Sequence, residues 1–255
     1  MDTHAEIHFL KRCWFLAVLL SVSIRAASQE RQVIHQNQQW IEYAASLKMN
    51  EQYSILVDGG YRWIDNYITG KMYYIRAGVS YSLSENVSVH AGFAHVGYFF
   101  DNDNLSQIEH RPYQELSIQN KVHKIGIFQR FRVEERFFEP MSSEYRRPYN
   151  WFNWRFRYMI MFNIPLFAFS KEHPEYRMSL GIGDELLLNA GKNINFNQFD
   201  QNRFLISPTF HFGKNLSVAV TWSNQYSSTF TQNRFIHAQV FWLQVQQKFD
   251  FSNKR

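Results

Sequence analysis

Apolar and polar residues alternate along most of this chain, from Trp40 to the C-terminus. In one segment, Leu216, Val218, Val220 and Trp222 alternate with smaller or more polar neighbours. A period of two places each set on one face of a β-sheet. The pattern therefore predicts an all-β fold built from strands with one apolar and one polar face.

Eleven segments carry this strand pattern clearly. A twelfth, at 29–37, is weaker and contains Arg31-Gln32-Val33-Ile34-His35-Gln36. The eleven segments are 39–48, 53–62, 71–83, 87–98, 112–122, 125–137, 152–164, 176–189, 202–212, 216–225 and 235–250.

The connections between these segments alternate in length. Four are short (49–52, 84–86, 123–124 and 213–215), five are long and polar (63–70, 99–111, 138–151, 190–201 and 226–234), and 165–175 is the exception. Outer-membrane barrels have short turns at one rim and longer loops at the other. We therefore expect an antiparallel up-and-down transmembrane β-barrel. If both chain ends lie at the short-turn rim, the barrel has an even number of strands, about 12, of which the first is weak. The alternative is a barrel of ten strands. In that case segment 29–37 is tucked into the lumen or merged into the next strand.

The N-terminus has the features of a signal peptide. Lys11 and Arg12 precede an apolar run, 13–24, which is followed by the small residues Ala26, Ala27 and Ser28. The run is too short to span a bilayer as a helix. We expect a signal peptide at 1–28, an N-terminal segment or weak strand at 29–38, a single barrel domain at 39–251 and an overhang at 252–255. The expected location is the outer membrane of a Gram-negative bacterial cell, after cleavage.

Composition narrows the function classes. The net charge of +5 is mild and the basic residues do not cluster, so we expect no nucleic-acid partner. The only cysteine, Cys13, lies in the predicted leader, so thiolate catalysis and cysteine-ligated metals are excluded from the mature chain. The expected partners are outer-membrane lipid and the barrel-assembly machinery.

Charged residues lie in register along several strand segments. In 130–137, basic and acidic side chains share one face, opposite Phe131, Val133 and Phe137. Charges on a lipid-facing surface cost about 2–4 kcal/mol each near mid-membrane, so this face must line the lumen. Glu135 falls on the other face and is expected near an interface or on a bulge. The alternation slips in 180–189, the segment that contains Asp184 and Glu185, which suggests a bulge there. The predicted lumenal charge network consists of Arg130, Arg132, Glu134, Arg136, Arg155, Arg157, Glu185 and Arg203.

This network has two interpretations. The side chains either neutralise one another as cross-strand pairs that close the lumen of a structural or interaction barrel, or they bind or pass small anionic solutes through an arginine-lined lumen. A lipid-modifying enzyme is a third possibility. However, no serine-containing motif accompanies the ten histidines, no glycine-rich phosphate loop is present, and no metal-ligand spacing occurs. We therefore expect no catalytic residue, metal or cofactor, and the sequence does not identify a substrate.

The charged segments also resemble an uncharacterised family of bacterial envelope proteins, DUF2490. The resemblance runs from about Gln39 to Phe251, and it implies a signal peptide and an outer-membrane-type barrel without assigning an activity. One departure is that Phe251, a C-terminal aromatic of the type that assembly machinery reads, is followed by four further residues. The stretches that carry the resemblance are 109–116, 130–137, 154–158, 183–189 and 199–203.

Overall fold

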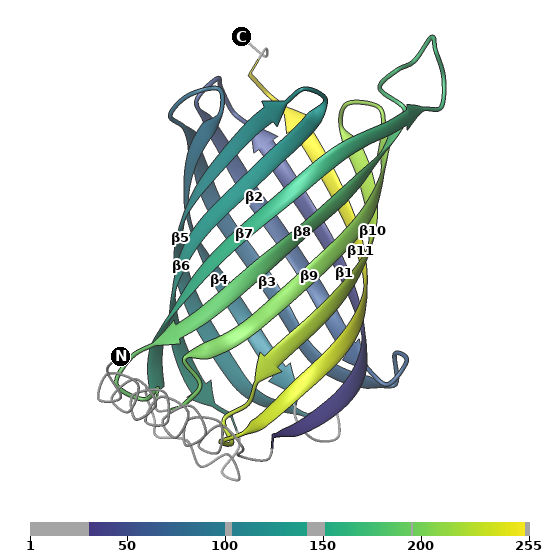
Figure 1. Cartoon of the computed structure of the whole chain (residues 1–255). Helices are drawn as coiled ribbons and strands as arrows, with labels where there is room; N and C mark the ends of the chain where they lie inside the picture. Colours follow the sequence, from purple (N-terminus) through teal and green to yellow (C-terminus); the bar gives the residue numbers. More distant parts are fainter. Residues whose placement is uncertain (1–30, 100–103, 142–150, 195, 253–255) are drawn as a thin grey trace, which may run out of the picture. The chain divides into compact units, whose positions relative to one another are not determined.

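A computed structural model describes residues 31–99, 104–141, 151–194 and 196–252. From Val33 onward the chain forms one compact unit, a closed barrel of tilted strands (Figure 1). The predicted signal peptide lies outside the described residues. In the part of the chain that is described, no helix has the length and apolar character needed to cross a membrane.

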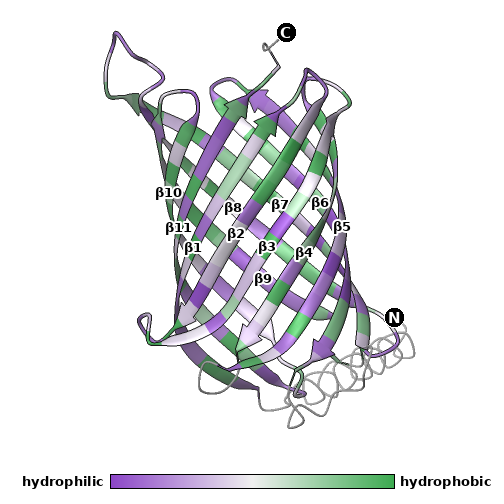
Figure 2. Ribbon diagram, turned by 180° about the vertical axis from the view of Figure 1, so that it is seen from behind, coloured by the Kyte–Doolittle hydropathy of each residue, from purple (hydrophilic) through white to green (hydrophobic). Residues whose placement is uncertain are grey.

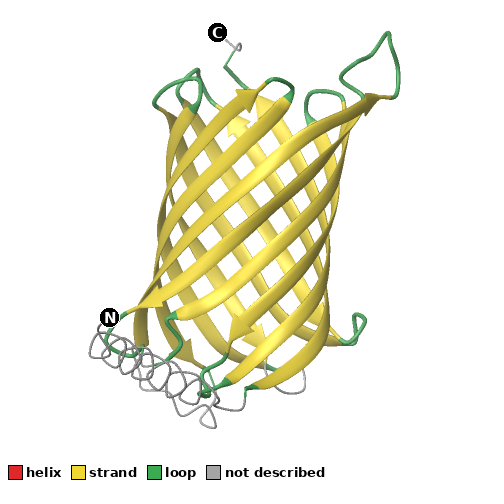
Figure 3. Ribbon diagram, viewed as in Figure 1, coloured by secondary structure: helices red, strands yellow, loops and turns green. Residues whose placement is uncertain are grey.

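The barrel has eleven strands, which correspond one for one to the eleven clear segments of the sequence pattern. The all-β barrel prediction is confirmed, and the number of strands lies between the two expected values. The strands extend over almost the full height of the barrel, and the loops are confined to the rims (Figure 3). The strands are β1 Gln32–Lys48, β2 Tyr53–Ile64, β3 Thr69–Ser82, β4 Val87–Phe99, β5 Leu105–Val122, β6 Ile125–Pro140, β7 Trp151–Ala168, β8 Arg177–Ala190, β9 Phe199–Phe212, β10 Leu216–Ser228 and β11 Arg234–Asp250.

The weak N-terminal segment does not form a strand of its own. From Gln32 it continues without a break into the segment at 39–48, giving one strand of 17 residues. This is the merging that was considered for a ten-stranded barrel. Nothing in the sequence of β1 forces a turn, so the chain extends instead of reversing.

An odd number of strands changes how the barrel closes. Every pair of consecutive strands is antiparallel, so β1 and β11 run in the same direction and meet as a parallel pair. Along this seam the residue numbers of both strands increase in the same direction, as expected for a parallel pair. His35 contacts His237, Trp40 packs on Trp242, and the Phe251 N–H donates to the Lys48 carbonyl. As a result β1 begins at one rim, here the N-terminal rim, and β11 ends at the other, the C-terminal rim.

The expected contrast between short and long connections is weaker in the structure. Only four residues separate β2 from β3, as many as separate β1 from β2. The turn is tight because Asp65, Asn66 and Tyr67 all adopt positive φ values, which Asp and Asn tolerate well. The loop predicted at 99–111 is largely strand, because its polar residues face the lumen and are not part of a solvated loop.

Hydrophilic and hydrophobic residues alternate along many of the strands (Figure 2), so the two faces of the sheet differ in character. Large apolar side chains are exposed on the outer wall, and most of the buried polar and charged side chains point inward. The assignment of the arginines to the inside and the apolar face to the outside therefore agrees with the structure. Exposed apolar residues of the outer wall include Ile41, Val57, Ile75, Val79, Phe93, Phe131, Phe156, Leu188, Phe204 and Phe241.

Aromatic rings gather at both ends of the outer wall. Towards the N-terminal rim Tyr61 packs on Trp63, and towards the C-terminal rim Tyr53 packs on Tyr81. Tyr53 and Trp63 lie ten residues apart on β2. At about 3.3 Å per residue and a tilt of about 35–45°, they are separated by roughly 25 Å along the barrel axis. The outer wall is therefore an apolar belt between two aromatic girdles.

Two details of the sequence interpretation can be compared with the structure. Glu135 lies on the outer face as expected, and Gln114 donates to its carboxylate. Of its two expected settings the bulge is wrong, because β6 is regular there. The irregularity suggested for 180–189 is present, because the register of β8 against β9 shifts at Leu187/Leu188. The extra residue is Asp200 on β9, whereas β8 itself alternates strictly, with Asp184 pointing outward and Glu185 inward. The polar and apolar residues of β8 look out of phase because the buried, inward-facing Leu187 is apolar and the outward-facing Asp184 is charged. Asn202 donates a hydrogen bond to the carboxylate of Asp184.

Candidate functional site

All eight residues of the predicted charge network lie in the lumen, on β6, β7, β8 and β9. The regular register places Arg132 beside Arg157 and Glu134 beside Arg155 on neighbouring strands, with Met159 beside Glu185 on the next pair. Seven of the eight are buried, and Arg130 is partly exposed to the cavity. We call this surface, together with Glu109, Arg111, Glu115 and Asp200, the ionic wall.

Glu134 is one centre of the ionic wall. Its carboxylate accepts hydrogen bonds from Arg155 at 2.5 Å and from Arg157 at 2.8 Å, and the guanidinium groups of Arg111 and Arg132 lie 3.8 Å away. Four arginines from three strands therefore converge on one buried carboxylate. Because an unpaired buried charge is costly, this arrangement holds β5, β6 and β7 together.

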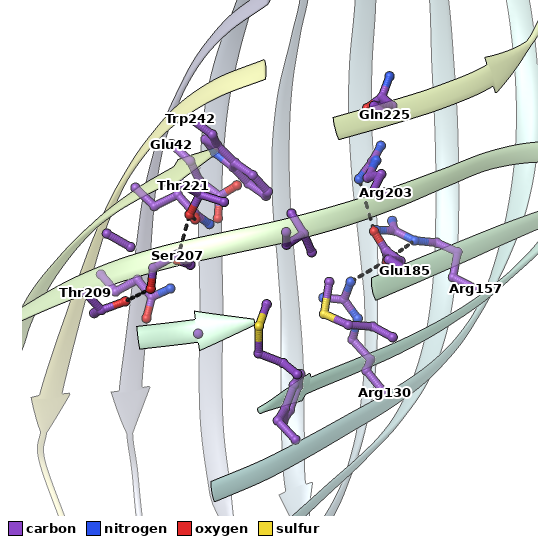
Figure 4. A pocket seen from close by; sticks show the side chains of 18 of the residues that line it. Glu42, Arg130, Arg157, Glu185, Arg203, Ser207, Thr209, Thr221, Gln225 and Trp242 are labelled. Atoms are coloured by element: carbon purple, nitrogen blue, oxygen red, sulfur yellow. Dashed lines mark hydrogen bonds and ion pairs between the residues drawn. The ribbon is translucent and has the colours of Figure 1, made fainter. Parts of the chain in front are cut away.

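Glu185 is the second centre, and it faces the cavity (Figure 4). It accepts from Arg157 at 2.5 Å, from Arg130 at 2.6 Å and from Arg203 at 3.1 Å. Arg157 bridges the two centres because it also binds Glu134.

Several members of the ionic wall are not among the residues predicted from the sequence. Glu109, which binds Arg111 at 2.6 Å and Arg136 at 2.8 Å, fell in a segment assigned to a loop. Glu115, which binds Arg132 at 2.5 Å, lies in the predicted strand 112–122 but is not among the predicted network residues. The alternation of Gln107, Glu109, Arg111, Tyr113 and Glu115 on one face was the signal that could have identified them.

A second charged group lies on β1, β2 and β3, and no sequence argument had identified it. Arg76 binds Asp58 at 2.5 Å, and the Tyr74 hydroxyl donates to Glu42. The guanidinium of Arg62 lies 3.8 Å from the centre of the Trp40 ring. Each of these strands contributes only one or two charges, so no single segment resembles a charged ladder.

The remaining part of the lumen is uncharged, and we call it the neutral wall. It consists of Ser207, Thr209, Ser217, Ala219, Thr221, Gln244 and Gln246, from β9, β10 and β11. The hydroxyls of Ser207 and Thr221 are 2.7 Å apart, and Thr221 donates to Gln244 at 2.9 Å.

A cavity of about 1250 Å³ lies between these surfaces. Residues from all eleven strands line it, so it is the unfilled part of the barrel lumen (Figure 4). Among the described residues its lining carries eleven Lys and Arg side chains and three Asp and Glu side chains. Several of these cations are paired with carboxylates behind them, such as Glu134, yet the surface that faces the cavity is predominantly cationic.

The described residues offer little catalytic or metal-binding chemistry. No group of three or more His, Cys, Asp or Glu side chains that could hold a metal ion occurs among them. Ser179 and the His211 imidazole are 3.0 Å apart at the cavity surface. Within the described part of the chain no carboxylate lies within 4.0 Å of His211, so the pair lacks the acid that orients histidine in a catalytic triad.

Comparison with known proteins gives one match. Residues 37–236 match the model of a family described as a protein of unknown function, DUF2490. No curated protein and no solved structure matches the chain.

Proposed function

Because the chain belongs to the DUF2490 family, whose function is unknown, we propose a role from the geometry of its barrel. The protein is an outer-membrane β-barrel that admits or binds small anionic solutes in a cationic lumenal cavity. The observation that carries this proposal is the excess of basic over acidic side chains around the cavity of about 1250 Å³.

The outer wall supports a membrane location. It exposes apolar side chains around the barrel, and an exposed apolar surface of this extent is unfavourable in water. Its height of roughly 25 Å between aromatic girdles equals the apolar band of outer-membrane barrels. Expected partners are therefore outer-membrane lipid and the machinery that inserts barrels, after removal of a signal peptide at 1–28.

The ionic wall supports a division of roles inside the lumen. Each of the eight predicted residues is paired with a side chain of opposite charge, so the network acts as a structural brace on that side. It does not fill the lumen. The solute occupies the space between the ionic and neutral walls, where guanidinium groups suit oxyanions through their planar donors.

Fractionation and solute uptake test the proposal together. We expect the full chain, expressed in a Gram-negative host, in the outer-membrane fraction. Liposomes containing the refolded protein should take up small phosphorylated and carboxylated solutes faster than cations of the same size. A detergent-free soluble monomer would refute the membrane location. Liposomes with correctly folded protein and no anion preference would favour a purely structural barrel.

A pair of substitutions tests the apolar belt directly. Ile75, 59% exposed, lies mid-strand on the outer wall, and Leu83, 58% exposed, lies in a turn at the C-terminal rim. Ile75→Arg should lower the free energy of unfolding in bilayers by about 2–4 kcal/mol if this surface contacts lipid. Leu83→Arg should cost less than about 1 kcal/mol, because it lies outside the hydrocarbon region. Equal small effects would indicate a barrel surrounded by water.

A further inference from the structure

Two lumenal cations near the N-terminal rim lack the carboxylate partners that the ionic wall provides. Among the described residues, no Asp or Glu oxygen lies within 4.0 Å of the charged nitrogens of Arg62 on β2 or Lys71 on β3. Both line the cavity and both are partly buried. In contrast, the unpaired cations at the opposite mouth, Lys121, Lys124 and Arg177, are solvent-exposed.

A bulge directs Lys71 into the lumen. β3 pairs with β2 regularly up to Arg62 and Met72, and then Trp63 pairs with Gly70, so that Lys71 is an extra residue. Its ammonium donates to the side-chain oxygen of Gln36 at 3.2 Å. β-Bulges redirect side chains near functional sites. Without this one, Lys71 would fall on the outer face with Tyr73.

Arg62 is held by stacking and leaves its hydrogen-bond donors unused. Its guanidinium lies over Trp40 at 3.8 Å, and Arg203 approaches the same ring at 5.4 Å. Glu42 lies on the neighbouring strand, but its carboxylate accepts from Tyr74. Within the described residues Arg62 donates no side-chain hydrogen bond, so its nitrogens are available to a ligand in the cavity.

A row of contacting side chains continues from this cationic pair around the barrel. Arg62 is opposite Trp40, Trp40 packs on Trp242 at 5.2 Å, and Trp242 is opposite Thr221. Thr221 in turn contacts Ser207. The row therefore runs from two positive charges, past the indoles of Trp40 and Trp242, to hydroxyl groups on β10 and β9.

We propose that Arg62 and Lys71 bind the phosphate group of a small phosphorylated polyol, whose hydroxyls contact the neutral wall. This deepens the proposed function and rests on it for the solute's access to the lumen. Two unpaired positive charges match a phosphate monoester, which carries about −1.5 to −2 at pH 7, better than a single carboxylate. Arginine supplies a planar set of donors and lysine a point charge, as phosphate sites use them.

Binding to the folded full chain in detergent tests the site without requiring transport. The probes are glycerol phosphate, inorganic phosphate, acetate and glycerol, followed by tryptophan fluorescence and calorimetry. We expect glycerol phosphate to bind at least about tenfold more tightly than acetate or glycerol. Arg62→Gln and Lys71→Gln should each weaken it by about tenfold or more. Lys121→Gln removes the same charge at the exposed mouth and should leave affinity within about twofold.

The outcomes separate this site from the general function. Equal affinity for glycerol phosphate and acetate, or full affinity in Lys71→Gln, overturns the site even if liposomes prefer anions. Tight binding that both variants abolish supports the site even if liposomes transport nothing. If Arg62→Gln fails to fold, Lys71→Gln alone decides whether the site binds phosphate. Lys71 lies in a bulge at the end of the barrel, where a substitution disturbs the fold less.

Discussion

The ionic wall and the neutral wall share one lumen but fill it differently. On the ionic wall, long charged side chains reach across strands, and Glu134 and Glu185 each hold several arginines. On the neutral wall, the side chains are short, and one chain of hydrogen bonds runs from Ser207 through Thr221 to Gln244. Both walls use strands of the same barrel with the same inward alternation.

The difference teaches that charge determines how much of the lumen is occupied. A buried charge needs a partner in contact, so arginines and carboxylates pack into a continuous brace. Hydroxyl and amide groups satisfy one another at short range or are solvated by water, and they leave space in front of them. The cavity therefore reaches the neutral wall and the cationic pair, while Glu109, Glu115 and Glu134 do not line it.

The largest effect should come from the centre of the ionic wall. Glu134→Gln leaves Arg155 and Arg157 without their shared carboxylate, and we expect the free energy of unfolding to fall by about 3–5 kcal/mol. Urea titration in detergent measures it. The neighbouring Glu135→Gln makes the same chemical change on the outer face and should cost at most about 1 kcal/mol. Equal losses would show that the network does not brace the barrel.

A smaller loss is expected on the neutral wall. Thr221→Val removes the hydroxyl that joins Ser207 to Gln244, and should lower the free energy of unfolding by about 1–3 kcal/mol. Thr209→Val is a suitable control, because among the described residues its hydroxyl makes one long hydrogen bond, to the Ser207 carbonyl at 3.4 Å. The same titration compares them. A loss for Thr221→Val as large as that for Glu134→Gln would remove the energetic distinction between the walls.

The smallest effect on stability, with a large effect on solute passage, should come from filling the cavity. Ser217 lines it on β10, while its neighbour Val218 faces outward. Ser217→Tyr should change the free energy of unfolding by only about 0.5 kcal/mol and slow the uptake of anions by liposomes. Val218→Tyr should leave uptake unchanged. If both variants transport at the wild-type rate, solutes do not pass along the neutral wall.

Alternation in the sequence was sufficient to predict the strands and the direction of their faces. Arg132 and Arg157 could be assigned to the lumen because lipid-facing charges are unfavourable, and the structure brings them together with Glu134 and Glu185. The number of strands could not be derived from the sequence. An even number is expected only if the first and last strands pair antiparallel, and here they pair in parallel. Nothing in the sequence around Gln36 signals that β1 runs straight through.

The cationic pair, Arg62 and Lys71, could not be predicted from the pattern of single strands, for a different reason. Arg62 is the only basic residue of β2, and its neighbours in the strand form no charged ladder. Lys71 has the alternation phase of an outward-facing residue, and only the bulge turns it into the lumen. Their lack of carboxylate partners depends on which strands meet around the barrel. Contacts across a closed sheet are set by register and bulges, and a single sequence specifies these only weakly.

The parallel seam also constrains how the chain assembles. Ten of the eleven strand pairings join consecutive strands and can form locally, whereas Trp40 must find Trp242, 202 positions further on. Closure is therefore the one step that depends on distant parts of the chain, and it should come late in folding. Since β1 begins at one rim and β11 ends at the other, no short linker can join these two strand ends. A circular permutation that connects them would require a linker as long as the barrel is tall.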